Sequence, residues 1–393
     1  MTSPRVQVAV FFIVATAVYG GLHSYLWLKA TRQLGLNGAV AVAMGLFFAL
    51  MVVAPFLGRR LLRDGSALFN AAEFVTFLWM GIAFYLFVLN LGADLWNLAA
   101  ALVRGIVPDT NIPTCGGARL FWGIAVATAL IVGWAAVEAA NVRLRRIEIP
   151  TAKLAPGNRP LRIVQVSDVH LGLLVGPRRL GTILARVREA EPDLLVATGD
   201  MLDAVGDHLE PLAAQWREIN PRLGKFAITG NHEYYNGVPG AIAFLEGAGF
   251  RVLRDETVVL PGVNLIGKEY RAPRGLPGAP SRLRPLTELV PEGAPGLFTL
   301  LLNHIPTGFE EEAAPLGVDL QLSGHTHDGQ MFPFRWLVRL SFKHLAGLSR
   351  QGDSLLYVSR GTGTWGPPLR FLAPPEVTLI ELVPAGRRDG VRV

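Results

Sequence analysis

The pattern of hydrophobic and polar residues changes near residue 150. Before that point, apolar residues form four long runs, at positions 6–28, 38–57, 74–91 and 120–137. Each run is long enough for a helix to cross the hydrocarbon core of a bilayer, and none has the polar face of a helix at the surface of a soluble protein. After residue 160 the apolar runs are short and separated by amphipathic segments. We therefore expect a membrane region followed by a folded domain.

The membrane region is expected to be an all-α bundle of about four transmembrane helices over residues 1–146. The third run continues through Asp94 toward Val103, which indicates a tilted or broken helix. The first run is not a cleavable signal peptide, because it is too long and further spans follow it. The alternative is a buried bundle of a soluble protein, but isolated runs of this length more often span a membrane.

Basic residues are distributed unevenly between the two ends of the four predicted spans. Cytoplasmic loops of membrane proteins carry an excess of Lys and Arg. Seven such residues lie on the side of the two termini, namely Arg5, Arg59, Arg60, Arg63, Arg143, Arg145 and Arg146. Four lie on the other side, namely Lys29, Arg32, Arg104 and Arg119. We therefore predict a multi-pass protein of the cell membrane with its folded domain in the cytoplasm.

The remainder of the chain divides into a linker, residues 147–160, and a folded domain, residues 161–393. Three prolines discourage a continuous helix in the linker, namely Pro150, Pro156 and Pro160. In the domain, short apolar runs such as Leu194–Ala197 alternate with helical patterns such as Pro177–Ala190. This order of strands and helices predicts a layered α/β core.

Metal-binding side chains follow the first strand of this domain. Asp168 and His170 come directly after the apolar run that ends at Val166. Side chains two positions apart on an extended segment point the same way, so one carboxylate and one imidazole can bind a single ion. Four more blocks each follow a strand-like run: Gly199-Asp200, Gly230-Asn231-His232, Asn303-His304 and Gly324-His325-Thr326-His327. Open α/β sheets build their sites at such strand ends.

These five blocks, in this order, resemble the calcineurin-like metallophosphoesterase superfamily over roughly Leu161 to Leu382. The stretch Gly361–Pro368 is similar to a bacterial, membrane-associated subgroup of that superfamily. The resemblance implies a four-layer sandwich of two mixed β-sheets flanked by helices. It also implies a hydrolase in which hydroxide bridging a dinuclear metal centre attacks a phosphate ester.

The resemblance further implies a role for each residue of the blocks. The first metal would be held by Asp168, His170 and His327, the second by Asn231, His304 and His325, and Asp200 would bridge the two. The catalytic residue would be His232, which would bind no metal and would protonate the leaving group or stabilise the phosphoryl group. Such a mixture of carboxylate, amide and imidazole suits Mn, Fe or Zn.

Two further carboxylates lie beside these blocks. Asp203 occupies a position where the superfamily often places a carboxylate that orients an imidazole, and an exposed loop aspartate is the equal alternative. Asp328 follows His327 where the resembled subgroup commonly has glycine. We expect it to perturb that histidine or to touch the first metal.

Composition refines the choice of partners. Hydrophobic residues make up 51% of the chain and charged residues only 17%, which agrees with a membrane region. The pI near 9.7 comes from residues 1–150, with 11 Lys/Arg against 6 Asp/Glu, whereas the rest of the chain has 26 against 25. A nucleic-acid binder usually carries a basic field, so we expect a bilayer and a phosphoester as partners and no nucleic acid. The sequence supports no inference of a protein partner.

The segment Met331–Leu348 suggests a class of substrate. It combines aromatic residues such as Trp336 and Phe342 with basic ones such as Arg335 and Arg339 at near-helical spacing. Interfacial segments have this composition, so we hypothesise that it guides a phospholipid or nucleotide-linked lipid into the site. Aromatic residues that simply pack under a loop are the alternative.

Two other functions remain open for the whole chain. It could be a metal-dependent nuclease or nucleotide phosphodiesterase, or a non-catalytic membrane module with a vestigial fold.

Overall fold

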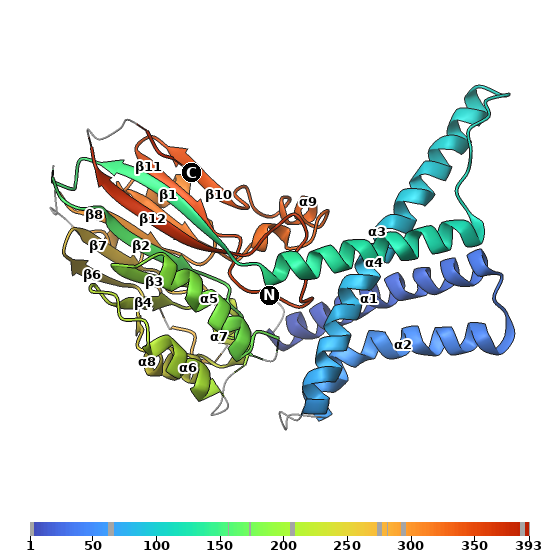
Figure 1. Ribbon diagram of the computed structural model, residues 1–393, viewed down its shortest axis with the longest axis horizontal. Coiled ribbons are helices and arrows are strands. Elements are labelled where there is room, and N and C mark those ends of the chain that lie inside the picture. The colour runs from blue at the N-terminus through green and yellow to red at the C-terminus, as the bar shows by residue number, and fades with distance from the viewer. Residues whose placement is uncertain are drawn as a thin grey trace. The chain divides into compact units, whose positions relative to one another are not determined.

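The computed structural model describes residues 4–61, 67–155, 157–172, 174–204, 209–272, 277–280, 282–291, 296–385 and 390–392 (Figure 1). The chain forms two compact units. One comprises Met1–Ala136 with Gly366–Leu369, and the other comprises Val137–Trp365 with Arg370–Val393.

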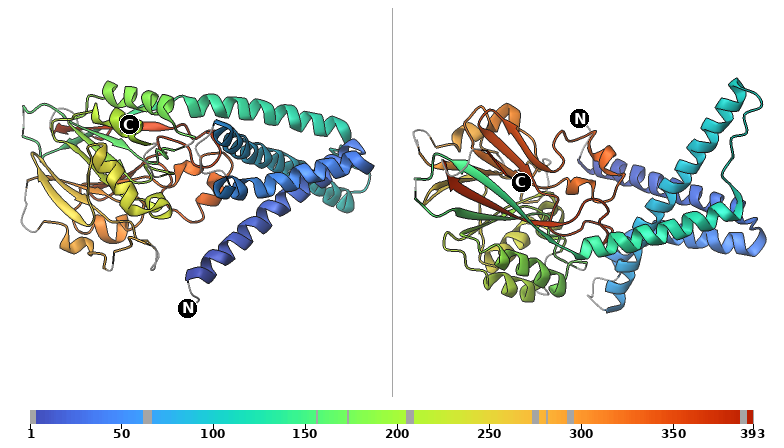
Figure 2. Two further views of the ribbon diagram at one scale, coloured as in Figure 1. Left: turned by 90° about the horizontal axis from the view of Figure 1, so that it is seen from below. Right: turned by 45° about the horizontal axis from the view of Figure 1, so that its top comes forward.

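The first unit consists mainly of four helices, seen from two further directions in Figure 2: α1 (Pro4–Leu34), α2 (Gly38–Leu61), α3 (Ala67–Ile106) and α4 (Gly117–Ala140). Within the described residues, three stretches are long and apolar enough to cross a membrane, namely Gly38–Pro55, Ala71–Ile106 and Gly117–Ala140. The predicted span 6–28 lies within α1, where several side chains are outside the described residues, so it stays a prediction. An apolar helical region at the N-terminus is confirmed.

The third helix is longer than its predicted span. It runs unbroken through Asp94 to Ile106 over 40 residues, a length of roughly 60 Å, whereas the hydrocarbon core measures about 30 Å. A membrane therefore covers only part of α3 unless the helix is strongly tilted. Outward-facing apolar side chains such as Leu46 and Leu130 are exposed on the helices, as a lipid-facing surface requires.

The second unit contains two six-stranded sheets. The first has the order β1-β12-β2-β3-β4-β5, and the second the order β10-β11-β9-β8-β7-β6. Parallel pairs join β2, β3, β4 and β5 in the first sheet and β7, β8, β9 and β11 in the second. Antiparallel pairs place β12 beside β2, β6 beside β7 and β10 beside β11, so both sheets are mixed.

The strands of the first sheet are β1 (Arg143–Thr151), β2 (Leu161–Val166), β3 (Leu194–Thr198), β4 (Lys225–Ile228), β5 (Arg251–Val252) and β12 (Glu376–Pro384). Those of the second are β6 (Glu256–Leu260), β7 (Val263–Gly267), β8 (Phe298–Leu302), β9 (Leu320–Ser323), β10 (Gly347–Gln351) and β11 (Ser354–Val358). The helices of this unit are α5 (Pro177–Glu189), α6 (Glu210–Arg217), α7 (Asn231–Asn236), α8 (Val238–Gly247) and α9 (Arg335–Val338).

Alternating side chains of the strands fill three apolar layers. Ile163 packs with residues of the second sheet such as Leu300 in the layer between the sheets. Its neighbour Val164 points the other way and packs with residues such as Trp216 of α6, because successive strand side chains alternate between faces. The outer face of the second sheet packs on short helical turns through residues such as Phe309. This confirms the predicted α/β sandwich of two mixed sheets flanked by helices.

The start of the second unit differs from the predicted boundary and linker. Residues 143–151 form β1, which pairs in parallel with β12 at the edge of the first sheet. The side chains of Ile147 and Ile149 are buried, which follows from the alternation of polar and apolar residues there. Pro150 is compatible with this strand because β1 lies at the edge of the sheet. Within the described residues, its outer side is joined only by the single bridge between Glu148 and Arg392.

Candidate metal centre

Strand ends from both sheets bring the predicted site residues together. Asp168 and His170 follow β2, Asp200 follows β3, and Asn231 and His232 open α7 directly after β4. From the second sheet, His304 follows β8, and His325 and His327 follow β9. All eight residues chosen from the sequence therefore lie at the carboxyl ends of parallel strands.

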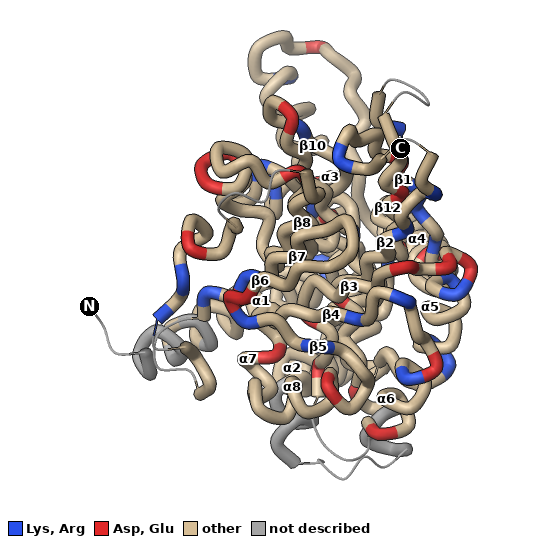
Figure 3. Tube along the Cα trace, turned by 90° about the vertical axis from the view of Figure 1, so that its left-hand side faces the viewer, with Lys and Arg blue, Asp and Glu red and all other residues tan. Residues whose placement is uncertain are grey.

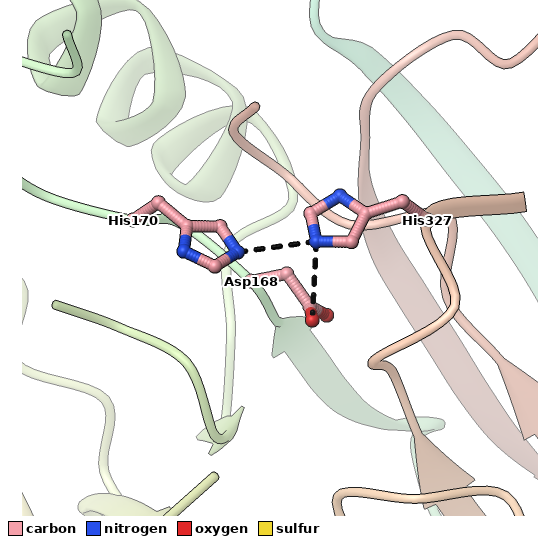
Figure 4. A group of neighbouring side chains, drawn as sticks. All are labelled: Asp168, His170 and His327. Atoms are coloured by element: carbon pink, nitrogen blue, oxygen red, sulfur yellow. Dashed lines mark hydrogen bonds and ion pairs between the residues drawn. The ribbon is translucent and has the colours of Figure 1, made fainter. Parts of the chain in front are cut away.

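The first group of possible ligands contains Asp168, His170 and His327, whose donor atoms all lie within 4.8 Å of one another. In Figure 4 the two rings point at each other, with the carboxylate beside them. The Nε2 atoms of His170 and His327 are 3.1 Å apart, and His327 Nε2 is 3.6 Å from Asp168 Oδ1. Two imidazole nitrogens and a carboxylate oxygen are a donor set that fits a divalent transition metal.

The second group contains Asp200, His304 and His325. His304 Nε2 lies at its centre, 3.2 Å from Asp200 Oδ2 and 3.2 Å from His325 Nδ1. Asn231 joins this group, because its Oδ1 is 3.1 Å from the same nitrogen. His304 Nδ1 lies 2.8 Å from the carbonyl oxygen of Thr198. Donation from Nδ1 to that carbonyl leaves Nε2 as the ring nitrogen that would bind an ion after losing its proton.

Strained backbone gathers at these residues. Asp168, His170, Asp200, His325 and His327 all have φ between 50° and 71°, a region that costs non-glycine residues about 1 kcal/mol or more each. Left-handed residues of this kind cluster at functional sites, where the surrounding structure holds them in place. The backbone geometry thus marks five of the eight residues that the sequence motifs identify.

Two motif glycines are required by close approach rather than by their own φ. A Cβ on Gly230 would lie 2.2 Å from Asp200 Oδ1, and one on Gly324 would lie 2.2 Å from Asp168 Oδ2. Neither contact leaves room for a methyl group, because the blocking atoms belong to buried carboxylates. These glycines let neighbouring strand ends approach closely enough to form one site.

Asp203 joins two imidazoles. Its Oδ1 lies 2.8 Å from His170 Nδ1 and 2.7 Å from His232 Nδ1, and the two rings meet edge-on with centroids 4.6 Å apart. Donation from both Nδ1 atoms leaves both Nε2 atoms free, one directed to His327 and the other available at His232. The orienting role expected for Asp203 agrees with this contact better than the exposed-loop alternative does. These three side chains also lie close enough together to hold an ion.

The metal-free protein places positive charge between the carboxylates. Burial alone would lower the pKa of His170, but the Asp203 carboxylate raises it to about 9. Burial likewise opposes protonation of His304, yet Asp200 raises its pKa to about 10. Burial would raise the pKa of Asp200, but His304 and the neighbouring imidazoles hold it well below its usual value. Burial, helped by the charge of His304, lowers the pKa of His325 to about 4, so this ring keeps a lone pair.

Two charged residues of the site were missed by sequence reasoning. Glu233 is fully buried, and its carboxylate accepts hydrogen bonds from the backbone amides of Asp200, Met201, Leu202 and Gly230 at 2.7–3.2 Å. It therefore fixes the ends of β3 and β4 relative to each other. Its position next to Asn231-His232 was the available signal.

Arg370 is the other residue. It is fully buried, and its Nη2 lies 3.0 Å from His327 Nδ1. Its guanidinium also donates to the carbonyl oxygens of Gly363, Arg360 and His327 itself. Burial lowers its pKa to about 10, so it stays charged at neutral pH. It is the sole charged residue of the stretch 366–375, and this was the signal that could have identified it.

Asp328 does not join either ligand group. Its carboxylate pairs with Arg335 at 3.0 Å and with Arg360 at 3.3 Å, so it ties α9 to the segment that follows β11. The expectation that Asp328 would touch the first metal is not supported by this geometry. Two arginines satisfy the carboxylate instead.

Comparisons with known proteins agree with this geometry. The sequence profile of the calcineurin-like phosphoesterase family matches residues 161–329. A metallophosphoesterase of Aquifex aeolicus is 36% identical over 258 residues, which is 64% of this chain and 96% of that protein. One of Helicobacter pylori is 34% identical over 58% of this chain and 61% of its own length. A transmembrane protein with a metallophosphoesterase domain from Danio rerio is 30% identical over 96% of this chain and 89% of that protein. The chain therefore belongs to the calcineurin-like metallophosphoesterase family and is a metal-dependent phosphoesterase.

Proposed function

We propose that this protein is a membrane-anchored phosphoesterase with two divalent metal ions in its site and a lipid-linked phosphoester as its substrate. The observation that carries the proposal is the convergence of two donor groups from facing sheets. Asp168, His170 and His327 would hold one ion, and Asn231, His304 and His325 the other. Their N and O donors fit Mn, Fe or Zn.

Asp200 is the residue we assign to both ions. Its Oδ2 faces His304 of the second group, while its Oδ1 accepts a hydrogen bond from the backbone amide of His232. When bound, two divalent ions would neutralise phosphoryl charge and activate water for attack on phosphorus. The side chain of Asp200 is almost fully buried, so it would be available to ions held inside the site rather than to solvent.

His232 is the residue we assign to proton transfer. Its Nδ1 is held by Asp203 at 2.7 Å, which leaves Nε2 to carry or release a proton. The ring stands beside Tyr235 and Trp365, with centroid distances of 5.5 and 6.1 Å. A proton delivered from Nε2 to the ester oxygen would make that oxygen a better leaving group.

Exposed apolar side chains around the site support a substrate with an apolar part. Tyr235 and Trp365, which flank His232, are 63% and 54% exposed. Phe342 lies edge-on to the ligand His325, with centroids 5.3 Å apart. On the same segment, Trp336 is 62% and Leu340 84% exposed. Exposed apolar patches beside a binding site mark contacts with apolar ligands, membranes or proteins.

The segment that carries these residues is fixed to the metal-binding block. Arg335 opens α9 and pairs with Asp328, the residue after the ligand His327. The apolar side chains of Trp336 and Leu340 are therefore held near the site rather than on a free loop. In a chain with membrane helices, a substrate confined to the bilayer is also present at high effective concentration.

A nuclease is disfavoured by the charge of the second unit. Figure 3 shows Lys and Arg residues interspersed with Asp and Glu over the side in view, without one basic face. Nucleic-acid binding derives much of its affinity from basic residues that neutralise phosphates. A vestigial fold is disfavoured because the structure brings all eight predicted site residues into one cluster.

The metal content of the purified full chain tests the proposed centre. We expect two divalent ions per chain after reconstitution, and Mn-dependent hydrolysis of an aryl phosphodiester. Asp200→Asn should lose the paired ions and turnover together, because one carboxylate would serve both. Elemental analysis that finds only trace metal, or two ions retained by Asp200→Asn with full activity, would contradict the proposal.

The lipid substrate has its own test. Trp336→Ser with Leu340→Ser should lower hydrolysis of a phospholipid in vesicles about tenfold while sparing the soluble aryl phosphodiester. Val259→Ser is the matched control, since Val259 is also an exposed apolar residue, at 65%, but lies on β6. Equal loss on both substrates, or none on either, would reject the lipid while leaving the metal centre intact.

A further inference from the structure

A cavity of about 450 Å³ lies within the helical unit, remote in sequence from the metal centre. It is lined by the last turns of α1, by Asp94 of α3 and by the segment Cys115–Gly117 that leads into α4. Its lining includes two basic side chains, Lys29 and Arg32. Among the described residues that line it, Asp94 is the one acidic side chain. Small-molecule sites have volumes in this range.

The acidic residue of the cavity is already saturated. Asp94 Oδ1 pairs with Lys29, and its Oδ2 accepts a hydrogen bond from Tyr25 at 2.8 Å. One positive charge, that of Arg32, is left over among the lining residues once Lys29 and Asp94 are paired. A cavity with this surplus favours an anionic occupant.

The walls of the cavity are held by specific hydrogen bonds. Asn97 donates to the carbonyl oxygen of Cys115 at 2.7 Å and accepts from its amide at 2.8 Å. Trp96 Nε1 donates to the carbonyl oxygen of Pro113 at 2.9 Å. The segment before α4 is thereby fixed to α3. The space in front of Gly116 is open, since a Cβ there would meet no atom within 4 Å.

An apolar stripe begins beside the charged groups. Leu91, Leu95, Leu98 and Leu102 are exposed on α3, and their spacing of three and four residues places them on one helix face. Asp94, which lines the cavity, lies three residues after Leu91 and four before Leu98, so the cavity borders this stripe. A charged pocket that continues into an apolar face matches an amphiphile with an anionic head.

We propose that this cavity binds the phosphate of an anionic phospholipid, with Arg32 and Lys29 on the phosphate and the acyl chains along the leucine stripe of α3. Basic pockets between transmembrane helices bind anionic lipid head groups in this manner. The site differs from the catalytic one, because none of its lining residues belongs to the groups that could hold a metal.

Native mass spectrometry of the full chain, released from vesicles of equal phosphatidylglycerol and phosphatidylcholine, tests the site. We expect the wild type to retain phosphatidylglycerol preferentially, and Arg32→Gln to weaken that retention about tenfold. Arg32→Lys should recover part of it. Lys29 is left unchanged because its removal would leave the Asp94 carboxylate without its ion pair.

Arg104→Gln is the matched control, because Arg104 is a basic residue of the last turn of α3 that does not line the cavity. It should retain lipid as the wild type does. Both variants should keep the helical circular dichroism of the wild type and its turnover of soluble aryl phosphodiester. Equal retention of the two lipids by the wild type, equal loss in the two Gln variants, or displacement of the lipid by millimolar inorganic phosphate would overturn the proposal.

Discussion

At the scale of single residues, the contact between His232 and Asp203 separates proton transfer from metal binding. We expect His232→Ala to keep its metal and to lose turnover by ~10²–10⁴, the usual contribution of a general acid. Asp203→Asn should lose less, about 10–100-fold, because the imidazoles would be misoriented rather than removed. His344→Ala is the control, since that histidine pairs with Glu310 away from both ligand groups. Metal loss in His232→Ala would show that this ring is a ligand.

Metal binding should depend on pH, because protons compete with the ion for the same histidine nitrogens. The pKa values of His170 and His304 are raised to about 9 and about 10 in the metal-free protein, so both rings are protonated at neutral pH. An ion must displace these protons. The apparent affinity should therefore rise with pH, by up to about a hundredfold per unit for two protons, and level off above the raised pKa values. Isothermal titration with Mn²⁺ between pH 6 and 9 measures this slope, and a flat profile would contradict the assigned charges.

The clustering of the candidate ligands could be predicted from sequence because each one closely follows a strand, and strand ends converge in a layered α/β fold. Their individual roles were inferred from the family resemblance. Glu233 and Arg370 could not be identified in the same way. The first acts through four backbone amides of two loops, and the second through a ring nitrogen of a residue 43 positions away. Contacts of this kind depend on the tertiary arrangement rather than on a local pattern. Asp328 is the opposite case. Its position next to His327 suggested contact with a metal, but its carboxylate pairs with two arginines in the structure.

At the scale of elements, most strands after residue 160 were recognised from their apolar runs, whereas β1 and β10 (Gly347–Gln351) were not. The prolines of the linker excluded a helix, but an edge strand tolerates Pro150. The short alternation Ile147-Glu148-Ile149 was the signal for β1. The consequence is that the second unit begins before Arg143 rather than at residue 161.

A buried residue of β1 tests this boundary. Ile147 is fully buried between the sheets, so Ile147→Ala should lower the free energy of unfolding by ~2–5 kcal/mol, as for other buried isoleucines. Arg145→Ala, at an exposed position of the same strand, should change it by less than about 0.5 kcal/mol. Denaturant unfolding of the full chain, followed by Trp fluorescence, measures both. Equal and small effects would mean that β1 does not belong to the folded core.

At the scale of the whole molecule, the distribution of basic residues predicts on which side of the membrane catalysis takes place. Arg143, Arg145 and Arg146 follow directly after α4, whereas Lys29, Arg32, Arg104 and Arg119 lie near the opposite helix ends. With α1 as a fourth span, both termini would lie on one side, and the excess of Lys and Arg places that side in the cytoplasm. A fluorescent reporter that folds only in the cytoplasm should therefore be active when fused after Val393. The same reporter inserted near Asn111, between α3 and α4, should be inactive. An active reporter at Asn111 together with an inactive one at the C-terminus would reverse the assignment and place the metal centre outside the cell membrane.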